Sequence, residues 1–152
     1  MKTPTLRRSV ITATAVLLGS AAWAPAATAS ESPEDQVVAL VNEARAKVGC
    51  SAVTVDPRLT QAAAGHSADM ANRSFFDHTN PDGVTFDQRI KNAGYPEPGA
   101  ENIAQGQRTA AEVMDGWMGS AGHRANIEDC SLKTIGVAVS ETGNYWTQDF
   151  GR

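Results

Sequence analysis

The chain has 152 residues, of which 13 are basic and 17 acidic, so its formal net charge at pH 7 is −4. That length suits one domain with one hydrophobic core. An acidic chain gains nothing from the phosphate backbone of nucleic acids, so nucleic-acid binding is disfavoured.

The N-terminal residues have the pattern of a secretory signal peptide. The apolar stretch is too short and too rich in alanine to span a hydrocarbon core of ~30 Å, which argues against a single-pass anchor. We therefore predict a signal peptide over residues 1–29 and a secreted mature domain over 30–152 with no membrane span and a net charge of −7; whether export is general or twin-arginine stays open. The features that carry this prediction are the basic residues Lys2, Arg7 and Arg8, the apolar residues 10–23, and the A-x-A cleavage signal Ala27-Thr28-Ala29.

Two helices with the same kind of start are predicted next. Ser32 and Asp56 can each cap the free N–H groups of a helix, and each is followed by a proline, which suits the first helical position. Apolar residues at helical spacing follow in both segments, and Gly49 ends the first. His66 lies on the apolar face of the second segment, so we interpret it as a packed histidine with one hydrogen-bond partner rather than a ligand.

The middle of the chain is predicted to be irregular with short elements. Residues 80–83 form a strong turn, a short helix covers 86–93, and a short strand covers 101–104. Thr109 and Glu112 form a capping box that opens a further helix. Trp117 lies on the apolar side of that helix and is expected to be buried.

The end of the chain changes to the period of a strand. Alternating apolar residues run from Ile135 to Val139, a turn follows at 142–144, and residues 145–150 run back. This pattern predicts a β-hairpin. Helices first and strands last favour an α+β fold with an antiparallel sheet.

Cys50 and Cys130 are the only two cysteines, and both follow the predicted cleavage point. Two cysteines in an exported chain are most simply a disulfide. A zinc-binding or catalytic thiol role is the alternative.

His78, Glu101 and His123 lie in three segments that we expect to be loops, and they are the candidate site. Two imidazoles and a carboxylate suit a zinc site with an open position for water, although the helical spacing HExxH is absent. Two alternatives stay open: a metal-free hydrogen-bonded cluster, or separate local roles for each residue. A Ser-His-Asp site built from Ser120, His78 and Asp77 has less support, because the chain has no G-x-S-x-G elbow.

The chain from about residue 35 to 151 resembles a bacterial CAP domain, of the superfamily of cysteine-rich secretory, antigen 5 and pathogenesis-related 1 proteins; bacterial members are often called SCP-like extracellular proteins. The matching segments occur in order and cover almost the whole mature chain. They are Leu40-Val41-Asn42-Glu43-Ala44-Arg45, Asp56-Pro57-Arg58-Leu59, Ala62-Ala63-Ala64-Gly65-His66-Ser67-Ala68-Asp69-Met70, Phe76-Asp77-His78, Pro81-Asp82-Gly83, Arg89-Ile90, Ala93-Gly94-Tyr95, Gly99-Ala100-Glu101-Asn102-Ile103-Ala104, Trp117 to Ile127, and Tyr145-Trp146-Thr147-Gln148.

The resemblance implies an α-β-α sandwich with a central antiparallel sheet. It also implies that His78, Glu101 and His123 meet in one cleft, with Ser120 and Asn102 in its lining. Ser120 stands where many members have a second glutamate, and Gly122-His123-Arg124-Ala125-Asn126 replaces the familiar Gly-His-Tyr-Thr-Gln. The cleft therefore keeps enough ligands for a metal but is poor in general acid–base partners.

We interpret the mature protein as a monomeric, non-catalytic binding module. Its cleft is expected to hold a divalent metal, with zinc the favoured ion, and to accept a lipid or cell-envelope ligand, as some CAP proteins do. The alternative is a metal-assisted hydrolase acting on peptides or envelope polymers. That alternative needs a general base beyond the metal ligands, and no motif supplies one.

Overall fold

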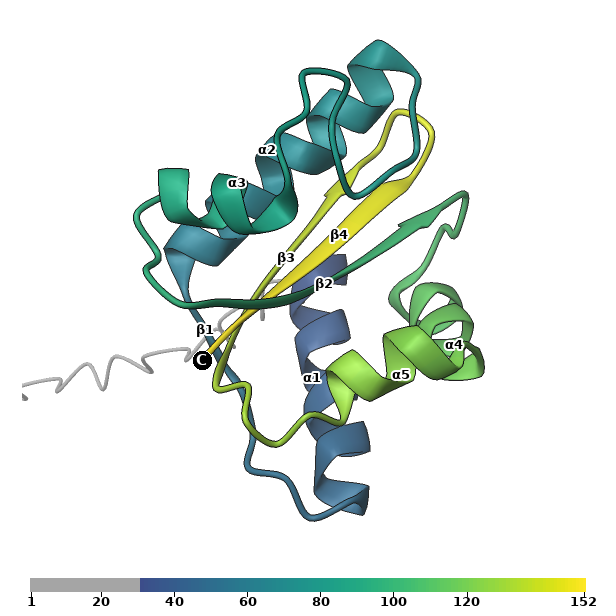
Figure 1. Cartoon of the computed structure of the whole chain (residues 1–152). Coiled ribbons are helices and arrows are strands. Elements are labelled where there is room, and N and C mark those ends of the chain that lie inside the picture. Colours follow the sequence, from purple (N-terminus) through teal and green to yellow (C-terminus); the bar gives the residue numbers. More distant parts are fainter. Residues whose placement is uncertain (1–30) are drawn as a thin grey trace, which may run out of the picture.

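The computed structural model describes residues 31–152, so the predicted signal peptide over 1–29 lies outside the described residues. Within 31–152, helices cover both faces of one sheet, with α2 and α3 on one face and α1, α4 and α5 on the other (Figure 1). The elements in chain order are α1 (Pro33–Lys47), β1 (Thr54–Val55), α2 (Pro57–Arg73), α3 (Phe86–Asn92), β2 (Pro98–Gln105), α4 (Ala110–Gly119), α5 (Ala121–Ile127), β3 (Thr134–Ser140) and β4 (Tyr145–Gly151).

The predicted helix starts are confirmed. The Ser32 hydroxyl accepts a hydrogen bond from the Asp35 N–H at 3.1 Å, and the Asp56 carboxylate accepts one from the Arg58 N–H at 2.9 Å. Each cap satisfies a backbone donor that has no partner inside its helix. Gly49 follows α1 with a φ of +79°, a left-handed conformation that glycine adopts without steric cost.

The sheet has the strand order β1-β3-β4-β2. β3 and β4 form the predicted antiparallel hairpin, and β2 pairs with the other side of β4, also antiparallel. The two-residue strand β1 pairs parallel with β3 and makes the sheet mixed; a segment this short carries no period for a sequence to reveal. The predicted α+β sandwich is confirmed, and its central strand β4 is buried along its whole length.

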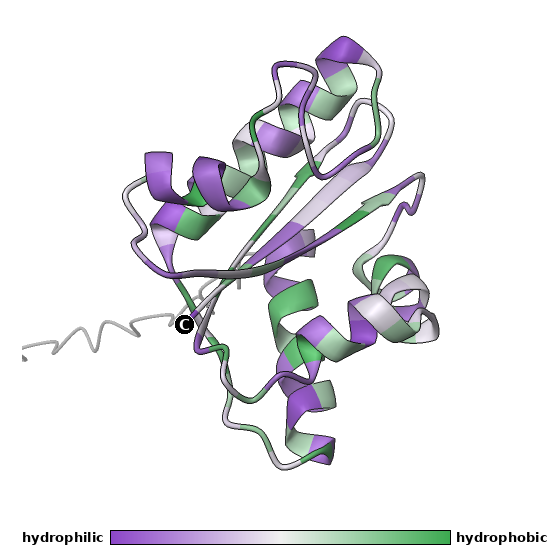
Figure 2. Ribbon diagram, in the orientation of Figure 1, coloured by the Kyte–Doolittle hydropathy of each residue, from purple (hydrophilic) through white to green (hydrophobic). Residues whose placement is uncertain are grey.

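The two faces of β4 differ in polarity because side chains alternate along a strand. Trp146 and Phe150 belong to the core formed with α1 and α4. On the opposite face, Thr147 accepts a hydrogen bond of 2.8 Å from Ser67 of α2, and Asp149 lies two residues further along that face. Polar residues thus lie beneath α2, which itself alternates between hydrophilic and hydrophobic residues along its length (Figure 2).

The outer edge of the sheet, strand β2, is covered by side chains of α4 and α5. Trp117 is buried as predicted, at 1% exposure, and its indole N–H donates to the carbonyl of Ile103 at 3.1 Å. The Asn126 amide donates to the carbonyl of Glu101 at 3.4 Å. Carbonyls that would otherwise attract another strand therefore already have donors.

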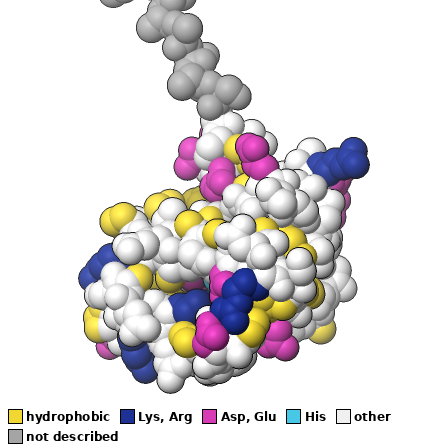
Figure 3. Space-filling view, turned by 90° about the horizontal axis from the view of Figure 1, so that it is seen from above, with side chains coloured by type: hydrophobic (Ala, Val, Ile, Leu, Met, Phe, Trp, Pro, Cys, Tyr) yellow, Lys and Arg dark blue, Asp and Glu magenta, His cyan; other side chains and the backbone are white. Residues whose placement is uncertain are grey.

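Large apolar side chains are exposed at three places among the described residues: Val48, Val55 and Phe76. The face viewed in Figure 3 shows basic, acidic and apolar side chains mixed together, without a broad field of one sign. No continuous single-charge surface is visible on that face.

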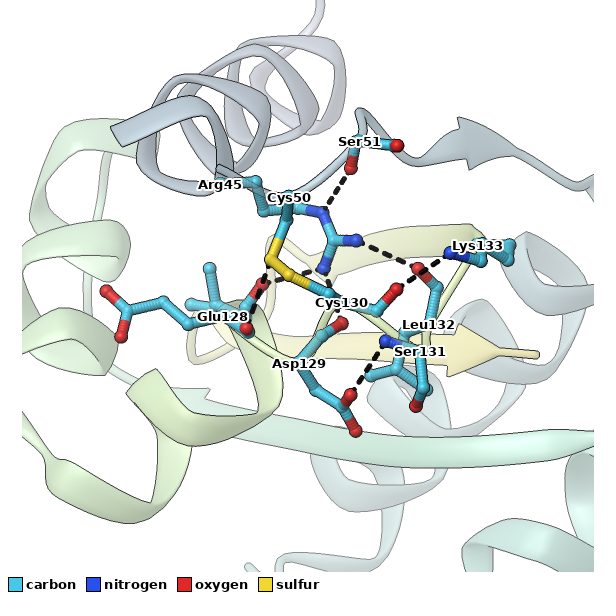
Figure 4. The surroundings of a disulfide bond; sticks show 10 residues. Arg45, Cys50, Ser51, Glu128, Asp129, Cys130, Ser131, Leu132 and Lys133 are labelled. Carbon is cyan, nitrogen blue, oxygen red and sulfur yellow. Dashed lines mark hydrogen bonds between the residues drawn. A yellow bond between two sulfur atoms is a disulfide. The ribbon is translucent and has the colours of Figure 1, made fainter. Parts of the chain in front are cut away.

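The predicted disulfide is confirmed: Cys50 and Cys130 are bonded across 80 residues of sequence. Beside it lies Arg45, a side chain with no exposed surface, which donates to four backbone carbonyls at 2.8–2.9 Å (Figure 4). Those carbonyls belong to Ser51, Ile127, Asp129 and Leu132. The disulfide and the guanidinium together tie the end of α1 to the segment that follows α5.

Candidate functional site

The three candidate residues lie on three kinds of element. His78 is in the loop between α2 and α3, Glu101 is on β2, and His123 is in the first turn of α5. The expectation of a loop is therefore wrong for His123, while Glu101 lies on the strand that was predicted over 101–104. That expectation missed α5 because this seven-residue helix has a single buried residue, Ile127, and so shows no apolar stripe.

Glu101 is the centre of the site, and its carboxylate is 1% exposed. One oxygen bonds Nδ1 of His78 at 2.8 Å, and the other accepts from Nη2 of Arg89 at 2.6 Å. An ionised carboxylate can only accept, so Nδ1 of His78 carries the proton that is donated. The Nε2 atom of the neutral ring is then left with its lone pair.

Electrostatics support an ionised Glu101 beside a basic His78. Burial acts to raise the pKa of Glu101, but the hydrogen bond from His78 and the charge of Arg89 outweigh it, and the pKa lies below its ordinary value. The hydrogen bond to Glu101 raises the pKa of His78, against the opposing effect of partial burial. The pair therefore behaves as a carboxylate that holds and orients an imidazole.

His123 lies on α5, which covers the face of the sheet opposite α2 and α3. Its carbonyl accepts a hydrogen bond from Asn102 at 3.2 Å. Burial and then the charge of His78 lower the pKa of His123, so the neutral ring is favoured. Over residues 31–152, no three His, Cys, Asp or Glu side chains lie in a group that could hold a metal ion as they stand, so the predicted metal set remains a prediction.

Arg89 is a functional candidate that sequence reasoning did not single out. Besides Glu101, its guanidinium donates to the carbonyls of His78 at 2.9 Å and Val84 at 3.1 Å. It thus holds both the carboxylate and the backbone of the loop that presents His78. Its place in a short amphipathic helix gives no local sign of this role.

A second carboxyl group lies directly behind the site. Asp149 is the cross-strand partner of Glu101, has no exposed surface, and neither of its oxygens has a hydrogen-bond partner among the described residues. Burial, and next the charge of Glu101, raise the pKa of Asp149 well above its ordinary value. The protonated acid is thereby favoured, and in that form it can donate to Glu101.

His66 belongs to the same buried set. It is fully buried, and its Nε2 bonds the carbonyl of Asp77 at 2.9 Å, next to His78. Burial lowers the pKa of His66. The prediction of a packed histidine with one partner is confirmed, and its contact helps to hold the His78 loop.

Two open hollows lie along the outer edge of β2. One, of about 520 Å³, is lined by His78, Glu101 and polar neighbours that include Asn126. The other, of about 320 Å³, is lined by His123, Phe76 and the edge of the α4 helix.

The two residues expected to line the cleft lie elsewhere. Asn102 is fully buried behind the hollows, where its amide donates to the Gln148 side chain at 2.9 Å and its oxygen accepts from Asn126 at 2.8 Å. Ser120 lies between α4 and α5 and does not line either hollow. Asn102 thus holds the backbone of His123 through the hydrogen bond to its carbonyl.

Comparison with known sequences gives relatives of unassigned function. Over 119 residues the chain is 41% identical to the uncharacterized protein YkwD of Bacillus subtilis (strain 168), which covers 77% of this chain and 46% of that protein. The chain thus spans less than half the length of this relative.

Two solved structures of bacterial proteins share this fold. An extracellular protein containing an SCP domain from Bacillus anthracis str. Ames aligns with a TM-score of 0.75 and 29% identity, covering 79% of this chain and 40% of that one. An outer surface protein of Borrelia burgdorferi aligns with a TM-score of 0.68 and 20% identity, covering 76% and 89% of the two chains, and shows the fold alone. Within 31–152, none of the helices has the length and apolarity needed to cross a membrane.

The family whose sequence profile matches this chain does so over residues 38–150, nearly the whole described domain. That range contains the disulfide, the buried Arg45 and all three candidate site residues. The chain belongs to the CAP family, described as the cysteine-rich secretory protein family.

Proposed function

We propose that this protein is a secreted, non-catalytic binding module whose cleft holds a divalent metal, with zinc the favoured ion, and through it an envelope or lipid ligand. The observation that supports this is the bond of 2.8 Å between His78 Nδ1 and the buried Glu101 carboxylate. A carboxylate that fixes one imidazole nitrogen and leaves the other to a metal is the usual arrangement around metal-binding histidines.

The free ring nitrogens of His78 and His123 support a metal held by imidazoles. Nε2 of His78 lies on a side chain that is 49% exposed, and no ring nitrogen of His123 is used in a hydrogen bond within the described part of the chain. Glu101 would act from behind His78, because its oxygens already bond His78 and Arg89. A metal bound there would supply positive charge that attracts an oxygen-bearing ligand.

Secretion is part of the same proposal. The predicted signal peptide over 1–29 supports it, as do the disulfide and the relatives described as extracellular or outer surface proteins. The monomeric state expected from the sequence remains a proposal as well.

The hydrolase alternative has less support. A general base must reach a substrate in the cleft, yet both oxygens of Glu101 are engaged and the side chain is 1% exposed. Asp149 is fully buried behind it. Neither of these two carboxyl groups faces the hollows as a free base, and Asp87, which lines the larger hollow, is bonded to the Thr85 hydroxyl and to Lys91.

Zinc titration by calorimetry tests the proposal. The wild type should bind one zinc ion, and the double variant His78→Ala/His123→Ala should lose this binding, while Gln61→Ala on the outer side of α2 should bind as the wild type does. Affinity should fall as the pH drops, first through the raised pKa of His78, because a protonated ring cannot coordinate. Equal binding by the wild type and the double variant would remove the metal from the proposal.

A further inference from the structure

The two hollows follow one another along the edge strand β2, whose pairing with β4 is irregular between Pro98 and Ala100. The larger is bordered by Gly99–Glu101 and the smaller by Ile103–Gln105, all on β2. The β2 residues that line the two hollows are about four residues apart, which is about 13 Å along a strand. His78 lines the first and His123 the second. A ligand that fills both must therefore be elongated and reach both histidines.

A peptide added as a further β-strand does not suit this edge. Strand addition relies on free carbonyl and N–H groups along the edge. Here the carbonyl of Ile103 is bonded to the Trp117 indole, and that of Glu101 to the Asn126 amide. Recognition must therefore depend on the side chains in the hollows.

Those side chains differ between the two hollows. The larger is lined by the hydroxyl of Thr79, the carboxylate of Asp87 and the amide oxygen of Asn126, whose N–H groups already bond Glu101 and Asn102. The smaller presents the ring of Phe76, which is 49% exposed beside His123. Hydroxyl, carboxylate and amide groups exchange hydrogen bonds with sugar hydroxyls, and an open aromatic ring offers an apolar surface to the flat face of a sugar.

The charge of the protein narrows the class of ligand further. Removal of the predicted signal peptide leaves 10 basic and 17 acidic residues, and the larger hollow is lined by two acids, Asp87 and the buried Glu101 that is paired with Arg89. A polyanion would be repelled by this balance. An uncharged chain meets no such repulsion and suits the hydroxyl, carboxylate and amide groups of the lining.

We propose that the two hollows along β2 form a continuous binding groove for a neutral glycan chain, with Phe76 stacking on one sugar and Thr79, Asp87 and Asn126 binding the hydroxyl groups of another. This rests on the proposed function only in placing the ligand in the cleft of His78 and His123. The glycan contacts named here do not require the metal.

Binding of a neutral N-acetylglucosamine tetramer to the full mature chain tests the groove, measured by calorimetry with a chelator and again with zinc. Phe76→Ala should weaken binding by about tenfold or more, and Thr79→Val by a smaller factor. Val48→Ala is the matched control, because Val48 is also 49% exposed but lies at the end of α1. It should bind the tetramer as the wild type does.

Several outcomes would overturn the groove. The wild type could fail to bind the tetramer at millimolar concentration, or Phe76→Ala and Val48→Ala could bind it equally well. The third such outcome is that the wild type binds a sulfated polysaccharide, an extended peptide or lipid vesicles more tightly than the tetramer. Zinc titration of Phe76→Ala separates this test from the earlier one, since that variant should bind zinc normally. Glycan binding without zinc binding would keep the groove and reject the metal site.

Discussion

Two buried ionisable groups in this molecule have opposite hydrogen-bonding surroundings. Arg45 has no exposed surface and donates hydrogen bonds to four carbonyls around the disulfide (Figure 4). Asp149 also has no exposed surface, but no donor among the described residues reaches either of its oxygens, and its cross-strand partner is another acid, Glu101.

This difference separates a structural region, around Arg45 and the disulfide, from a functional region, around Glu101 and Asp149; these are the two corners compared below. A buried group whose nitrogens all have hydrogen-bond acceptors specifies one arrangement of its surroundings. A buried acid without donors costs stability, and such groups concentrate at functional sites, where their effect on neighbouring charges is used. The predictions below test whether the two corners differ in this sense.

The largest loss of stability is expected from a substitution of Arg45. Arg45→Met fills a similar volume but leaves four buried carbonyls without donors, which should lower the free energy of unfolding by about 5 kcal/mol. Chemical denaturation measures this loss, and Arg108→Met, at an exposed arginine, is the control. A loss below about 1 kcal/mol would mean that the carbonyls find other partners and that this corner is not a structural anchor.

Loss of the disulfide should cause the next largest loss of stability. Replacing both Cys50 and Cys130 by serine removes a link across 80 residues, which the chain-entropy treatment values at about 4–5 kcal/mol. We expect a loss of about 3 kcal/mol, because the bonds of Arg45 still hold the same segment. Thermal unfolding of the double variant and of reduced wild type should agree; an unchanged melting temperature would contradict the expectation.

Asp149→Asn should act in the opposite direction and stabilise the protein. The raised pKa of Asp149 means that the folded protein keeps a proton which the unfolded chain releases above about pH 4. Stability of the wild type is therefore lost as pH rises above that value, and asparagine avoids this loss.

The expected gain for Asp149→Asn is about 1–3 kcal/mol at pH 7 and close to zero at pH 4. Urea unfolding at the two pH values measures it, with the exposed Asp115→Asn as control. Destabilisation at pH 7 would show that the ionised carboxylate is needed and that the two corners are alike.

The smallest effect concerns His78. Its pKa is raised in the folded state by Glu101, so the stability contributed by its charge is present below the unfolded value of about 6.5 and is lost as pH rises through the folded value. Because the ring is half exposed, we expect only about 0.5 kcal/mol between wild type and His78→Gln at low pH. NMR titration should show a lower His78 pKa in Glu101→Gln; an unchanged pKa would remove the carboxylate as its cause.

Local signals in the sequence were sufficient for much of the fold. Caps at Ser32 and Asp56, the apolar period of the helices and the alternation from Ile135 to Val139 each act between near neighbours in the chain. The disulfide followed from counting two cysteines in an exported chain. The helix α5 was missed because a short helix with one buried residue leaves no pattern.

The candidate site was predicted in part. His78 and Glu101 were expected together and are bonded, whereas Arg89 and Asp149 were not proposed. Nothing in their local sequence distinguishes Arg89 from a surface residue of a short helix, or Asp149 from any polar residue of a strand. Their roles depend on which side chains face them.

The sequence by itself determined the positions of the helix starts, the hairpin and the two sulfurs, since these depend on capping, period and residue type within a few positions. Only the tertiary structure decided that Arg45 meets four carbonyls, while Asp149 lies opposite Glu101 without a donor among the residues described. The physical reason is that burial and strand register join residues far apart in the chain. The free energy of a buried charge depends on those partners rather than on its neighbours in sequence.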